Sequence, residues 1–131
     1  MNATASAFRA AVESRDLQAG LAVLAEDVVF HSPAVHRPYA GKETVSALLT
    51  LVAETFENFR YTDELAGEDG THALIFRAEV GGKELEGIDL LRMNDAGEIA
   101  DLTVMVRPAS GLMALGAAMG PKVEAAGLKP S

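Results

Sequence analysis

A single carboxylate within an apolar, strand-like stretch is the residue best suited to chemistry. Asp89 lies in the segment 87–93, whose other members are mostly large and apolar. Asp is depleted from strands, because its short side chain competes for backbone hydrogen bonds and gains nothing from apolar burial. Side chains alternate between the two faces of a strand, so Asp89 shares a face with Leu91 and Met93. A carboxyl group in such surroundings is expected to have a raised pKa and to exchange protons near neutral pH.

Asp89 could instead have a purely structural role, in which it lies in a strand bulge and forms hydrogen bonds with backbone groups. A second candidate residue is His31. His31 ends a short β-branched segment, residues 27–31, and could shuttle a proton or orient a catalytic partner. Packing at the junction of a strand and a loop is the alternative for His31.

Composition narrows the possible ligands and partners. The chain has no cysteine, and its histidines lack the helical i, i+4 spacing of a metal site, so we expect neither a metal nor a disulfide. No phosphate-binding glycine pattern is present, so no cofactor is expected. The net charge of −8 disfavours nucleic acid and anionic membranes. This charge balance better suits an uncharged or weakly charged small hydrophobic molecule. No apolar run approaches the roughly 20 residues of a membrane span, so we expect a soluble, cytoplasmic protein.

The first half of the chain carries apolar residues at helical spacing. This pattern predicts helices over residues 4–12, 17–25 and 42–56. The short strand 27–31 lies between the second and third helices and ends before Pro33, which cannot donate to a strand ladder. The helices are expected to cover a sheet.

From residue 59 the period changes to two, which predicts strands over residues 59–67, 72–80, 87–93 and 99–106. After Pro108 the segment 109–126 is predicted to be a helix interrupted by glycines, acting as a lid or as an interface element. We expect one domain spanning residues 1–131. Both faces of the last strand are partly apolar, so we expect a homodimer formed through the sheet.

Three segments resemble the nuclear transport factor two-like, or SnoaL-like, superfamily. They are 25–33 (AEDVVFHSP), 39–43 (YAGKE) and 87–99 (GIDLLRMNDAGEI). The resemblance implies an α+β cystatin-like cone, with three N-terminal helices packed on a curved antiparallel sheet, a C-terminal helix, and a cavity between the layers.

Two branches of this superfamily imply roles for particular residues. The resemblance to ketosteroid isomerases places Asp89 at the oxyanion-hole Asp, Phe8 at the catalytic Tyr and Ser32 at the base. Both Phe8 and Ser32 therefore differ from that pattern. The resemblance to polyketide cyclases implies that Asp89 acts as the acid or base, with His31 nearby.

The function expected is that of an isomerase, cyclase or lyase that acts on a hydrophobic carbonyl compound through Asp89 and His31. The alternative is a non-catalytic module of the same fold that binds a hydrophobic ligand or mediates dimerisation. The side chains expected to bind substrate are Phe8, Phe30, Ser32, Tyr39, Phe56, Tyr61, Phe76, Leu91, Val104 and Met113.

Overall fold

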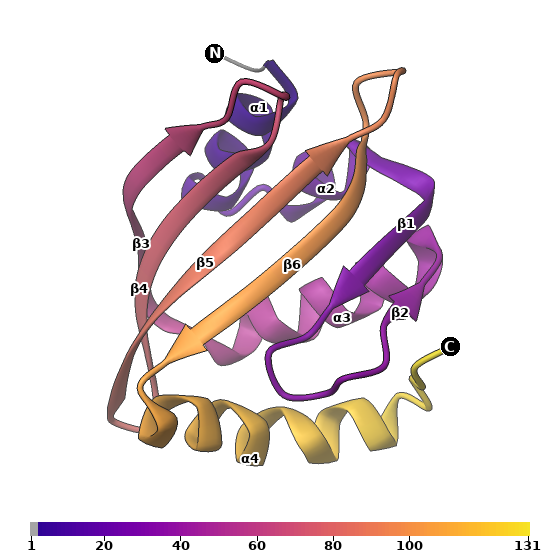
Figure 1. Cartoon of the computed structure of the whole chain (residues 1–131). Coiled ribbons are helices and arrows are strands. Elements are labelled where there is room, and N and C mark those ends of the chain that lie inside the picture. Colours follow the sequence, from indigo (N-terminus) through magenta and orange to yellow (C-terminus); the bar gives the residue numbers. More distant parts are fainter. Residues whose placement is uncertain (1–2) are drawn as a thin grey trace.

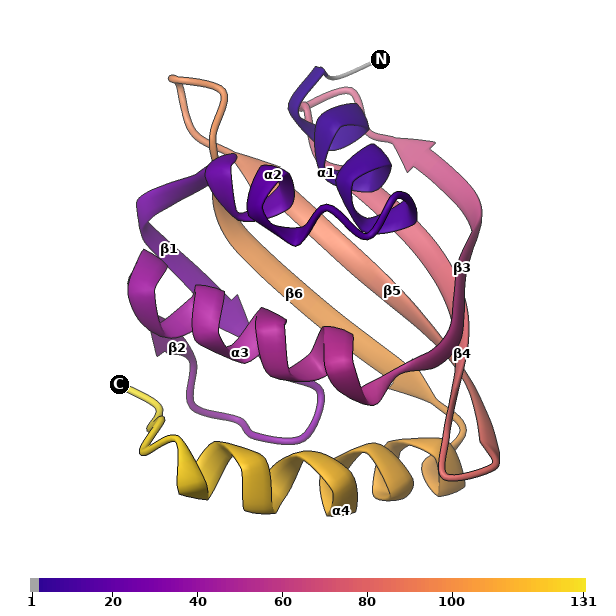
Figure 2. The same ribbon diagram turned by 180° about the vertical axis from the view of Figure 1, so that it is seen from behind.

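The chain forms a six-stranded sheet with helices on one face, as shown by a computed structural model that describes residues 3–131. The elements in chain order are α1 (Ala3–Glu13), α2 (Leu17–Ala22), β1 (Leu24–His31), β2 (Tyr39–Ala40), α3 (Lys42–Thr55), β3 (Glu57–Ala66), β4 (His72–Val80), β5 (Lys83–Met93), β6 (Ile99–Arg107) and α4 (Ala109–Ala125). Helices α1, α2 and α3 cover one face of the sheet, here called the inner face, and α4 runs along one end of it (Figure 2). The opposite, outer face carries no helix in the described part of the chain (Figure 1).

The predicted α+β fold with N-terminal helices, a cystatin-like sheet and a C-terminal helix is confirmed. The strand order is β2-β1-β6-β5-β4-β3, and the neighbours from β3 to β6 are antiparallel. The expectation of an entirely antiparallel sheet is wrong, because β1 pairs in parallel with β6. A parallel pair needs a long crossover, here the whole chain from β2 to β5, and the alternation of side chains carries no information about strand direction.

The boundary between α2 and β1 also differs from the prediction. The second helix ends at Ala22, and β1 already begins at Leu24. Leu24 aligns with Ile99 of β6, and both residues are fully buried. Helix propensity is a weak preference, so pairing with β6 overrides the helical spacing of this segment.

A close approach between β4 and β5 shapes the sheet around the core. The ring of Phe76 lies over Gly87, where an added Cβ would be 2.6 Å from Phe76 Cε2 and 2.8 Å from the carbonyl oxygen of Met105. Phe76 in turn stacks on Phe59, with ring centroids 4.9 Å apart. Glycine at this position therefore permits the aromatic packing beneath the cavity.

The C-terminal helix α4 is continuous, although interruptions at its glycines were predicted. It packs against α3 and the strands β4, β5 and β6. Gly111 lies against Leu85, and Leu115 is buried. Within the described residues, no helix is long and apolar enough to cross a membrane.

Candidate active site

A cavity of about 490 Å³ lies between the helices and the inner face of the sheet. Its wall is mostly apolar and includes residues from all four helices and from β1, β3, β5 and β6. Six of the residues expected at the site line this cavity: Phe8, Phe30, Phe56, Tyr61, Asp89 and Val104. A pocket of this size with a few polar groups is typical of small-molecule sites.

Asp89 is the central polar group on the cavity wall. It projects from β5 toward the inner face, between Leu74 of β4 and Val104 of β6. The hydroxyl group of Tyr61 donates a hydrogen bond of 2.8 Å to Asp89 Oδ2. Burial raises the pKa of Asp89 to about 7, because a low-dielectric environment penalises the charged carboxylate, and the Tyr61 hydrogen bond acts in the opposite direction. Asp89 is therefore ready to exchange a proton near neutral pH.

Tyr61 is held in place by its neighbours. Its side chain is buried, and its ring meets that of Phe59 edge-on with centroids 5.0 Å apart. Burial, followed by the charge of Asp89, raises the pKa of Tyr61 well above its usual value. Tyr61 therefore stays protonated and serves as a permanent hydrogen-bond donor to Asp89.

Replacing Tyr61 by Phe is expected to raise the pKa of Asp89 above its value of about 7, because the change removes the donor that favours the charged carboxylate. A carbon NMR titration of the Asp89 carboxyl group would measure the shift. Tyr39→Phe is the matched control, since Tyr39 is also buried but lies on β2 outside the cavity lining. An unchanged or lower pKa in Tyr61→Phe would contradict this account of the pair.

A cluster of ionisable side chains adjoins Tyr61 on the side of α1. The guanidinium of Arg9 lies 5.7 Å from the centroid of the Tyr61 ring. Arg9 Nη1 binds Glu64 Oε1 at 2.9 Å, and Glu64 Oε2 lies 3.3 Å from Nε2 of the buried His72. This cluster was not predicted from the sequence. The turn between β3 and β4 could have revealed part of it, because hairpin pairing brings the end of β3, where Glu64 lies, beside His72.

Comparisons with known proteins show the family of the chain. Residues 5–102 match the model of the SnoaL-like domain. The chain belongs to the SnoaL-like family. No curated protein matches this SnoaL-like chain.

Solved structures include close matches to the SnoaL-like chain. A steroid delta-isomerase from Pseudomonas aeruginosa is 45% identical, with a TM-score of 0.89 and coverage of 95% of this chain and 91% of the other. An uncharacterised protein with a cystatin-like fold from Silicibacter pomeroyi is 33% identical, with a TM-score of 0.88 and coverage of 95% and 87%. A Mycobacterium tuberculosis protein in complex with estradiol-17beta-hemisuccinate is 20% identical, with a TM-score of 0.62 and coverage of 80% and 95%, and shows the same fold.

His31 lies away from the cavity of the SnoaL-like domain. Its Nε2 is 2.9 Å from Asp101 Oδ2, and Asp101 Oδ1 accepts a hydrogen bond of 3.1 Å from the hydroxyl of Thr103. Phe30, its neighbour in β1, faces the cavity, so strand alternation directs His31 to the outer face. The expectation that His31 assists Asp89 is therefore corrected, because the two side chains lie on opposite faces of the sheet.

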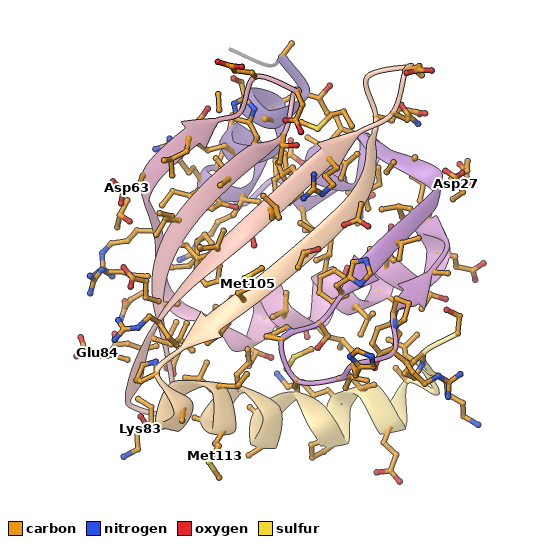
Figure 3. All side chains as sticks on the ribbon, in the orientation of Figure 1. Asp27, Asp63, Lys83, Glu84, Met105 and Met113 are labelled. Carbon is orange, nitrogen blue, oxygen red and sulfur yellow. The ribbon has the colours of Figure 1, made fainter. Side chains whose placement is uncertain are left out.

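The remaining expected site residues also lie outside the cavity lining. Ser32 Oγ accepts a hydrogen bond of 3.1 Å from the backbone N–H of Ala34, while Tyr39 packs in the core against Phe30. Phe76 and Leu91 are buried in the core of the sheet. Met113 is 73% exposed and points away from the domain (Figure 3), because α4 turns Gly111 and Leu115 inward instead.

Among the described residues, no group of three His, Asp or Glu side chains is arranged to hold a metal ion. The outer face of the sheet has a shallow hollow of about 240 Å³ beside Met105, which is 53% exposed and stands on the open side of β6 (Figure 3). The homodimer through this face stays a prediction, as does the role of α4 as a lid.

Proposed function

We propose that this SnoaL-like protein binds a small hydrophobic carbonyl compound in its cavity and acts on it by acid–base chemistry at Asp89. The observation that carries the proposal is the Asp89 carboxyl group on an apolar cavity wall, with a pKa raised to about 7. The relative from Pseudomonas aeruginosa, which is described as a steroid delta-isomerase, supports an isomerisation. The estradiol derivative bound by the Mycobacterium tuberculosis protein supports a polycyclic ligand.

The chemistry follows from the two protonation states of Asp89. Near its pKa, the carboxylate can take a proton from a carbon adjacent to the ligand carbonyl, and the resulting acid can return that proton to another carbon. Such a shift moves a double bond into conjugation without any net gain or loss of atoms. Tyr61 remains a neutral donor throughout and fixes the orientation of the carboxyl group.

The second candidate is a non-catalytic function, the binding of a hydrophobic ligand. The positions of three side chains in the structure favour it. Phe8 lines the cavity but has no hydroxyl group to donate. Ser32 is bound to the backbone of Ala34, and His31 faces the other side of the sheet. Asp89 would therefore have to act with Tyr61 alone, whereas a ligand could bind without any further group.

A turnover assay with the purified protein separates the two candidates. We expect a β,γ-unsaturated polycyclic ketone to be converted to its conjugated isomer, which absorbs in the ultraviolet. The saturated ketone of the same skeleton is the control. It should bind, and so change the NMR chemical shifts of residues that line the cavity, without reacting. Binding of both ketones without conversion would favour the non-catalytic function, and the absence of binding would contradict both candidates.

A further inference from the structure

The cavity lining includes two arginines in a chain whose overall charge is strongly negative. Arg15 reaches the lining from the connection between α1 and α2. Arg60 borders the lining from the edge strand β3, but it lies between Phe59 and Tyr61, which face the cavity, so strand alternation directs its side chain to the outer face beside Arg77. Both residues are exposed to solvent, whereas Asp89 and Tyr61 lie deeper. With a net charge of −8, the chain would on average place acidic rather than basic side chains around such an opening.

The backbone of Arg15 adopts a conformation that favours glycine. Its φ is 61°, and the end of α1 is closed by hydrogen bonds from the N–H of Asp16 to Ala11 O (2.9 Å) and from the N–H of Arg15 to Val12 O (3.2 Å). This is the Schellman pattern, in which glycine is the usual residue at the left-handed position. An arginine there keeps an unfavourable backbone conformation and places a cation beside the cavity.

The charges around the opening leave Arg15 available. Glu13 belongs to the same lining, and its Oε1 already lies 3.3 Å from Arg9 Nε. Arg60 Nη1 donates a hydrogen bond of 3.2 Å to the carbonyl oxygen of Asn58, which carries no charge. Within residues 3–131, neither Arg15 nor Arg60 forms an ion pair with an acidic side chain.

We propose that the natural ligand is amphipathic, with an apolar ring system in the cavity and an anionic group at the opening, bound by Arg15. Arginine suits this role because its planar guanidinium binds carboxylate and related oxyanions through paired hydrogen bonds. The inference rests on the proposed function, since the apolar body would occupy the same cavity with its carbonyl end at Asp89. Arg15 would then fix which end of the ligand lies at the opening.

Two dyes of the same aromatic skeleton test this inference. Anilinonaphthalene sulfonate carries an anionic group, and phenylnaphthylamine is its uncharged counterpart. Fluorescence titration of the full chain should show tighter binding of the sulfonate dye, and the preference should weaken as salt is added. Arg15→Gly should reduce the preference by up to about fivefold, the upper end for one solvent-exposed ion pair, and Arg60→Gln should leave it unchanged because Arg60 faces the outer side of the sheet. Affinity for the neutral dye should not change in either variant.

The variants allow a loss of dye binding to be distinguished from a loss of folding. Glycine is favoured at the φ of residue 15, so Arg15→Gly should fold at least as well as the natural chain. Lys83→Gln is the charge-matched control, because Lys83 is exposed in β5 and outside the cavity lining. Equal affinity for the two dyes, or a preference lowered equally by Lys83→Gln, would overturn the inference while leaving the proposed function intact. Failure of both dyes to bind would count against the proposed function as well.

Discussion

Replacing Asp89 by Asn is expected to lower kcat for an isomerisable ketone by at least about 100-fold, the usual contribution of a positioned acid or base. The amide has nearly the same shape as the carboxyl group and can still accept the hydrogen bond from Tyr61. It cannot take a proton from the substrate. Ligand binding, measured by NMR, should therefore persist while turnover is lost.

Asp101→Asn is the matched control for this experiment. Asp101 is also a carboxylate on a strand, but it belongs to β6 and pairs with His31 on the outer face. Turnover in Asp101→Asn should equal that of the natural protein. If Asp89→Asn kept full activity, or if both variants lost activity equally, Asp89 would not be the acid or base.

The same variant should change how stability depends on pH. The pKa of Asp89 is about 7 in the folded chain, against a usual value of 3.8 when exposed. Below the lower value both states are protonated, and between the two values only the unfolded state releases its proton. Stability of the natural protein should therefore fall from about pH 4 to about pH 7, by up to about 4 kcal/mol from this residue. Asp89→Asn should lack this decrease in urea unfolding curves measured across that range.

Replacing Gly87 by Ala is expected to lower the free energy of unfolding by at least about 2 kcal/mol, because overpacking forces side chains and backbone apart. The new methyl group would meet the Phe76 ring on one side and the Met105 carbonyl oxygen on the other. The ring could yield only by disturbing its stack on Phe59, which forms part of the cavity wall. Urea unfolding at constant pH would measure the loss.

Gly116→Ala is the opposite test of the same substitution. Gly116 lies inside α4, and no atom of the described chain lies within 4 Å of an added Cβ beyond the helix itself. Alanine should therefore stabilise the protein by about 0.5–1 kcal/mol, because it reduces the flexibility of the unfolded chain without a clash. A similar loss of stability in both variants would show that the Phe76 contact is not the cause.

The sequence predicted the features that depend on local patterns. Alternation in β4 and β6 located the strands, and the same alternation placed Asp89 on the inner face, where the structure has it. Alternation within β1 places Phe30 and His31 on opposite faces, yet the register of β1 against β6 was needed to know which of the two faces the cavity, because a slip of one residue exchanges the faces.

Other features depend on contacts between distant segments, which single-sequence patterns do not carry. Arg9 and Glu64 meet across 55 positions of the chain, and neither residue has a local signal for the other. The Tyr61 hydrogen bond to Asp89 depends on β3 and β5 lying on either side of β4. The residue types were visible in the sequence, whereas their partners became visible only in the folded chain.

The parallel pairing of β1 with β6 has a consequence for how the protein is made. The edge of β1 that pairs with β6 has no strand partner until β6 has been synthesised. Contacts between such distant parts of a chain form slowly, because closing the long intervening loop costs entropy. During synthesis α3 can cover the inner face of β1, but this edge stays unpaired while the hairpins of β3, β4 and β5 emerge. The cavity, which needs Phe30 and Leu102 on neighbouring strands, can form only after β6 has been synthesised.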